Sequence, residues 1–188
     1  MCMENLVGAD RSDSIDESLY ELLRRVGLRD PGTVVRNVCT WRGVECIAED
    51  IHKIWWTQVY PPFQADIAWL PKLLRTLYSY QVSFSYRPFD SRFLQKYSVS
   101  VRLIACSLVG EVVIECLPET LEVLCLNGNY LSGGLMIKKI PPKLQQIDVR
   151  YNNIDVAFVL EEVHTKDCLI LIETQRDGKR SMVEVLHP

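Results

Sequence analysis

Apolar residues in the second half of the chain recur with a spacing that repeats after 23 residues. The segments 121–131 and 144–154 both fit the pattern L-x-x-L-x-L-x-x-N-x-L, with isoleucine and valine replacing some leucines in the second segment. A proline stands three residues before each segment, at Pro118 and at Pro141. Repetition at this period indicates small structural units that stack against one another.

Weaker copies of the pattern extend the series toward the N-terminus. The segment that begins at residue 98 has Cys106 in the asparagine position, and the two segments before it have Val82 and Val59 there. The five segments begin at residues 51, 74, 98, 121 and 144. Each predicts a short strand whose apolar residues point into a coil, and because one coil cannot bury its apolar stripe alone, the coils must stack.

The ends of such a stack need covers, and a helix is expected at the N-terminal end. Ser14 and Glu17 form a capping box, and apolar residues follow at helical spacing. We expect an amphipathic helix from about Ile15 to Val26. At the other end, two apolar segments flank Asp177-Gly178, which predicts a β-hairpin.

The segment Cys39–Cys46 follows the expected helix, and Trp41 and Val44 can turn inward from a tight turn at Gly43. The two cysteines either form a disulfide or serve as small buried apolar groups. Seven cysteines without an export signal favour reduced thiols and an intracellular, cytoplasmic protein. The thiol state is therefore the expectation for this pair.

These repeats resemble the leucine-rich-repeat family. The C-x-W-x-G-V-x-C segment at 39–46 is similar to the N-terminal cap of plant-type members, and the proline placement is similar to repeats of protist proteins. The resemblance implies a curved parallel sheet with a concave binding face and no enzyme activity. It also implies that a ladder of asparagines is limited to Asn129 and Asn152.

The sequence thus predicts an α/β solenoid, a leucine-rich-repeat coil of about five turns with parallel strands on the concave side, an N-terminal helical cap and a C-terminal β-hairpin cap. We expect an N-terminal tail over 1–14, the helical cap over 15–50, the repeats over 51–165 and the hairpin cap over 166–188.

The concave face offers a candidate partner site. Because strand side chains alternate between the two faces of a sheet, the register above leaves every second residue outward. Aromatic and arginine side chains anchor many interfaces, and the outward positions carry a partner-binding set of these types, together with one aspartate: Trp55, Tyr78, Tyr80, Arg102, Asp148 and Arg150. Two alternatives remain open: the segment 61–63 covers the aromatics, or a register slip of one residue places them in the core.

Composition excludes several classes of function. The net charge of -3 creates no strong field for nucleic acid or anionic membranes, and no apolar run is long enough to cross a bilayer. The three histidines and seven cysteines lie at scattered positions, so we expect no metal, no cofactor and no small-molecule substrate. The expected function is a non-catalytic protein–protein interaction module, an adaptor or scaffold.

Parts of the sequence are compatible with three other functions. The apolar segment from Trp55 to Phe93, which includes Trp69, Tyr86 and Phe89, suits a structural subunit of a large ribonucleoprotein or cytoskeletal assembly. A cysteine-dependent enzyme is less favoured, because Cys106 and Cys116 fall in apolar positions and Cys125, although outward, has no histidine near it in the register. RNA binding would use a basic set that more often forms a solvated surface: Lys138, Lys139, Arg176, Lys179 and Arg180.

Overall fold

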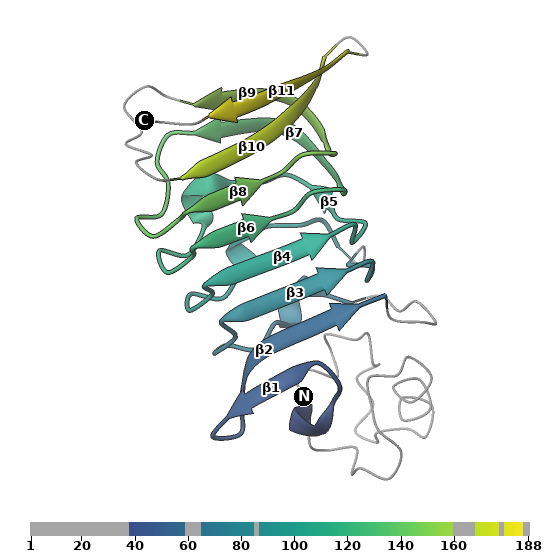
Figure 1. The fold of residues 1–188 in the computed structure, drawn as a ribbon, viewed down its shortest axis with the longest axis vertical. Helices are drawn as coiled ribbons and strands as arrows, with labels where there is room; N and C mark the ends of the chain where they lie inside the picture. Colours follow the sequence, from purple (N-terminus) through teal and green to yellow (C-terminus); the bar gives the residue numbers. More distant parts are fainter. Residues whose placement is uncertain (1–37, 59–64, 85–86, 160–167, 177–178, 186–188) are drawn as a thin grey trace.

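The chain forms a stack of short coils whose strands lie side by side (Figure 1). The computed structural model describes residues 38–58, 65–84, 87–159, 168–176 and 179–185. The expected tail at 1–14, the helix at 15–26, Val59 and the segment 61–63 lie outside the described residues. Among the described residues, no helix is long and apolar enough to cross a membrane.

The largest element is an eight-stranded sheet in the order β1-β2-β3-β4-β6-β8-β10-β11. Its strands are β1 (Val44–Ile47), β2 (Asp50–Thr57), β3 (Thr76–Tyr80), β4 (Ser100–Ile104), β6 (Val123–Cys125), β8 (Gln146–Asp148), β10 (Leu169–Arg176) and β11 (Lys179–Val185). The six strands from β2 to β10 pair in parallel. Only the two outermost pairs, β1–β2 and β10–β11, are antiparallel.

The register of the parallel strands follows the repeat found in the sequence. Ile54, Leu77, Val101, Leu124 and Ile147 lie side by side on successive strands, and each is at most 1% exposed. A second inward column two residues later is equally buried, and it consists of Trp56, Ser79, Leu103, Leu126 and Val149. The prediction of stacked parallel strands in this register is therefore confirmed, and the slip by one residue is excluded.

The return path of each coil holds short turns and a second sheet. Four 3-10 turns occur among the described residues: η1 (Val38–Thr40), η2 (Ile67–Trp69), η3 (Ser91–Phe93) and η4 (Ile114–Cys116). A parallel three-stranded sheet joins the later coils, with β5 (Val109–Gly110), β7 (Tyr130–Ile137) and β9 (Asn153–Val159). In Figure 1 this sheet lies behind the eight-stranded one, so apolar residues of both sheets share the interior.

The expected α/β class is wrong, because the described residues contain no α-helix and form a β-solenoid, while the helix of the expected cap lies outside the described residues. The reason lies in the leucine–proline steps that follow two of the turns. Proline keeps the preceding residue extended, and Leu70 and Leu117 have ψ angles of 139° and 145°. These two turns therefore end after three residues, and the chain leaves each of them in an extended conformation.

The coils bend sharply after each strand, and one backbone conformation repeats there. The residues at this position have positive φ in five successive coils: Gln58, Gln81, Ala105, Gly128 and Tyr151, at 44°, 56°, 53°, 73° and 56°. This left-handed conformation reverses the chain direction within one residue. It is costly for residues with a Cβ atom, so the stack must hold it in place.

Two buried asparagines connect neighbouring coils, as the resemblance implied. The Asn129 side chain accepts hydrogen bonds from the backbone N–H groups of Cys106 and Leu108, and it donates to the Leu103 and Leu126 carbonyl groups. Asn152 repeats this arrangement one coil later. These bonds satisfy backbone groups that the bend removes from the sheet and that would be costly to bury unpaired.

Both ends of the sheet are covered by antiparallel strands. At the C-terminal end, β10 and β11 form the hairpin expected from the Asp177-Gly178 sequence. At the N-terminal end, Trp41 and Val44 are 2% and 8% exposed, so they turn inward as predicted. Cys39 and Cys46 are joined by a disulfide, which corrects the expectation of two thiols. Because disulfides persist in oxidising compartments, this pair gives no support to the cytoplasmic expectation.

Candidate functional site

The outward face of the eight-stranded sheet carries a continuous row of side chains, here called the outward strip. Its central column is Trp55, Tyr78, Arg102, Cys125 and Asp148, which lie directly opposite one another on β2, β3, β4, β6 and β8. Tyr80 and Arg150 flank this column at the ends of their strands. The structure thus brings all six predicted partner-binding residues onto one face, and it leaves their binding role untested.

The first part of the strip is aromatic. Trp55 and Tyr78 stack with their ring centroids 4.3 Å apart and an interplanar angle of 23°. Half of the Trp55 surface is exposed, whereas its neighbour Trp56, which points inward, is 1% exposed. The Lys53 Nζ atom lies 5.5 Å from the Trp55 ring centroid and forms an ion pair of 2.6 Å with Glu45. The result is an exposed, laterally supported indole.

The middle of the strip holds a cation without a carboxylate partner. Arg102 is half-buried and donates a hydrogen bond from Nη1 to the Ser100 hydroxyl, at 2.5 Å. Among the described residues, no ion pair joins Arg102 to an acid. A guanidinium group has five N–H donors. Arg102 also lies within hydrogen-bonding distance of the Cys125 thiol, so the donors left over are the ones a carboxylate of a ligand could use.

At the far end of the outward strip, Asp148 and Arg150 form an ion pair with each other. Asp148 accepts three hydrogen bonds from Arg150. They come from the Arg150 backbone N–H at 3.1 Å, from the guanidinium Nε at 2.9 Å and from Nη2 at 2.7 Å. Hydrogen bonding to Asp148 raises the pKa of Arg150. Asp148 is 5% exposed. These two residues satisfy each other, so they offer a partner less than the sequence suggested.

Cys125 separates the two halves of the strip, and it is covered although it points outward. Only 6% of its surface is exposed. Burial raises the pKa of Cys125, while the nearby Arg102 and Arg150 charges oppose the increase and the Asp148 charge adds to it. A thiol of this kind is a poor nucleophile. Cys125 therefore offers a partner little contact surface.

The other free thiols differ in exposure. Burial raises the pKa of Cys106 to about 12 and that of Cys168 to about 11. Cys116, by contrast, is exposed, which corrects the sequence-based expectation that it is buried. Within the described ranges, no three His, Cys, Asp or Glu side chains come together as metal ligands would.

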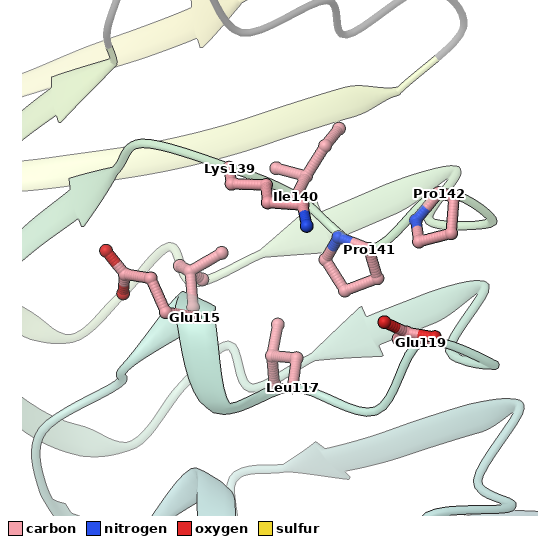
Figure 2. A pocket seen from close by; sticks show the side chains of 8 residues that line it. Glu115, Leu117, Glu119, Lys139, Ile140, Pro141 and Pro142 are labelled. Atoms are coloured by element: carbon pink, nitrogen blue, oxygen red, sulfur yellow. The ribbon is translucent and has the colours of Figure 1, made fainter.

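Two hollows lie away from the outward strip. One has a volume of about 100 Å³ and lies on the return side between the η4 turn and residues 139–142, where Glu115, Glu119 and Lys139 border an apolar floor (Figure 2). The other, of about 280 Å³, follows the starting edge of the strands between His52 and Lys143. Drug-sized ligands occupy roughly 300–1,000 Å³. The outward strip, with its exposed aromatic and cationic groups, is therefore the stronger candidate for a binding site.

Comparisons with known proteins do not assign the chain to a family. No family model and no curated protein matches the sequence. Among solved structures, the chain is similar to one from the crystal structure of the BIR3–SERK2 complex from Arabidopsis thaliana, with 22% identity and a TM-score of 0.47. The similarity covers 70% of this chain and 74% of that chain.

Proposed function

We propose that the chain is a non-catalytic interaction module whose outward strip binds a protein partner. One observation carries this proposal: Trp55 is half-exposed on a sheet whose inward columns are buried, it stacks on Tyr78, and it lies two strands from Arg102, which has no carboxylate partner among the described residues. Tryptophan, tyrosine and arginine dominate the binding energy of many interfaces. A rigid sheet presents them with little loss of conformational entropy on binding.

We further propose that the repeats belong to the leucine-rich-repeat type. The support is the sequence pattern of 121–131 and 144–154, together with the two asparagines that bond neighbouring coils. In repeats of this type the residues between the inward leucines face the binding side. The outward strip occupies that position here.

The direct test is affinity capture from a native extract with a tagged full-length chain, followed by quantitative mass spectrometry. Trp55→Ala and Arg102→Ala should each reduce the captured partner by tenfold or more, since truncating an interface anchor costs about 2 kcal/mol or more. Tyr130→Ala is the matched control, because Tyr130 is an aromatic with 61% exposure that lies on β7 instead. Equal loss with Tyr130→Ala would contradict the use of the strip.

A second candidate function, a structural subunit of a larger assembly, is favoured by the three-stranded sheet. Tyr130 and Met136 on β7 are 61% and 44% exposed, and Val109 on β5 is 39% exposed. Val109 pairs with Tyr130, and exposed apolar groups that lie side by side often mark an interface. The two functions separate by size-exclusion chromatography of the purified chain: an adaptor elutes as a monomer, and an obligate subunit aggregates without its neighbours.

A further inference from the structure

The outward strip combines a pair of stacked rings with one unpaired cation at a fixed spacing. We propose that it binds a proline-containing segment of a partner in the polyproline II conformation, with a single aspartate or glutamate three residues from the proline. The proline packs on the exposed part of Trp55, which Tyr78 supports from the next strand, and the carboxylate binds Arg102. This inference rests on the proposed function and specifies its partner.

The ring pair suits a proline because of how the rings stand on the sheet. Their centroid separation of 4.3 Å is close to the distance of about 4.8 Å between neighbouring strands. The two rings therefore face each other across β2 and β3 and form a ridge on the sheet. Segments in the polyproline II conformation are recognised largely through aromatic side chains, and they lose little entropy because their extended helix exists before binding.

The charges of the strip favour one carboxylate over a polyanion. Lys53 is neutralised by Glu45, and Arg150 is neutralised by Asp148. Arg102 is thus the cation of the described strip that has no acidic partner. A bound RNA strand would need several phosphate contacts, and the chain has a net charge of -3. A single acidic side chain satisfies Arg102 without further cations.

The spacing then fixes the position of the acid in the partner. Trp55 and Arg102 lie two strands apart in the same column, which is about 10 Å at the usual strand separation. A polyproline II helix has three residues per turn and rises about 3.1 Å per residue, so residues i and i+3 share one face about 9 Å apart. The spacing therefore matches a Pro-x-x-Glu or Pro-x-x-Asp segment that crosses the strands.

Labelled synthetic peptides and the full-length chain test this proposal by fluorescence anisotropy. The peptides have the same length and differ only in the charge or the position of one residue: Pro-x-x-Glu, Pro-x-x-Gln, Pro-x-Glu and Pro-x-x-x-Glu. The Pro-x-x-Glu peptide should bind best, and the other three about tenfold more weakly, as expected when a charge-assisted hydrogen bond is lost. In the Arg102→Gln variant, the Glu and Gln peptides should bind equally. Arg92→Gln, at an exposed arginine of the η3 turn, is the matched control and should leave the preference intact.

Three results would overturn the proposal. The first is equal binding of the four peptides, or none up to millimolar concentration. The second is a preference for glutamate that survives Arg102→Gln. The third is an oligouridine that binds the strip with steep salt dependence while the Pro-x-x-Glu peptide fails to compete. If any of these occurs while Trp55→Ala still abolishes partner capture, the peptide assignment fails and the proposed function stands.

Discussion

The Trp55 backbone N–H donates a 2.6 Å hydrogen bond to the Gly43 carbonyl, so the N-terminal cap holds the main aromatic residue of the outward strip in place. The two backbones also lie too close for a side chain at position 43, since a Cβ atom on Gly43 would lie 2.1 Å from the Trp55 carbonyl oxygen. Gly43 also has a φ of 78°. The N-terminal cap and the candidate site are therefore in direct backbone contact.

Gly43→Ala is expected to destabilise the chain severely. The added methyl group collides with backbone atoms that cannot move separately, and the left-handed conformation is itself costly, so the combined loss is about 3 kcal/mol or more. Urea denaturation measures it. Gly128→Ala is the control. Gly128 has a similar φ of 73°, but a Cβ atom there would lie 3.5 Å from its nearest neighbour, the Ala105 nitrogen, which is an ordinary contact. Equal losses in the two variants would show that the close contact does not matter.

A reciprocal pair of variants tests the bend that follows each strand. Ala105 and Gly128 occupy the same position in adjacent coils and both have positive φ. Ala105→Gly should raise the free energy of unfolding by about 1 kcal/mol, and Gly128→Ala should lower it by a similar amount, because only glycine adopts this conformation without steric cost. Loss of stability in Ala105→Gly would mean that the residue is not left-handed in solution.

The buried asparagines are expected to stabilise the stack more than their surface neighbours. Asn152→Leu removes the bond to the Leu131 N–H and the bonds to the Leu126 and Val149 carbonyl groups, which then remain buried and unpaired. The expected loss is about 3 kcal/mol or more, at about 1–3 kcal/mol for each group. Asn153→Ala changes the exposed neighbouring residue and should cost less than about 0.5 kcal/mol. Comparable losses of unfolding free energy in the two variants would contradict a stabilising role of the buried asparagines.

Much of this architecture could be predicted from the sequence, for a physical reason. The inward positions are apolar in nearly every coil, with Ser79 as an exception, so Leu124 and Ile147 indicate the register and the outward residues follow from alternation. The return path could not be predicted in the same way. Its conformation depends on local steps such as Leu117-Pro118, where the proline ends the turn before an α-helix can form.

The details of the site were less predictable than its location. Alternation places Asp148 and Arg150 on the same side of one strand, so their ion pair could have been anticipated from a spacing of two residues. The burial of Cys125 could not, because alternation predicts only that this residue points outward and not how much of it its neighbours cover. The positive φ angles of Gln81 and Tyr151 could not be predicted from the residue type, since neither glutamine nor tyrosine is typical of that conformation.

Cys106 should make stability decrease at alkaline pH. Its pKa is about 12 in the folded chain, against 9.0 for an exposed thiol. The folded state therefore keeps a proton that the unfolded state releases, so the contribution is complete below pH 9 and is lost as the pH rises toward 12. Urea denaturation between pH 8 and pH 11 should show a steeper decrease for the unsubstituted chain than for Cys106→Ala. Parallel curves would contradict the burial of this thiol.

The disulfide between Cys39 and Cys46 should stabilise the N-terminal end. Its two residues are separated by 7 positions, and a loop of this size is expected to contribute about 2–3 kcal/mol through the unfolded state. A reductant should lower the stability of the unsubstituted chain and leave a double Cys39→Ala, Cys46→Ala variant unchanged. If the reductant has no effect on either protein, the two cysteines are not joined in solution.

Trp55 and Trp56 provide the most direct test of the whole account, because adjacent residues are assigned to opposite faces of the sheet. The measurement is the free energy of unfolding of Trp55→Ala and Trp56→Ala in urea, combined with partner capture by Trp55→Ala. We expect Trp56→Ala to lose about 3–5 kcal/mol and Trp55→Ala about 1 kcal/mol, with capture lost in the latter. A collapse of stability in Trp55→Ala, or full capture by it, would contradict the account.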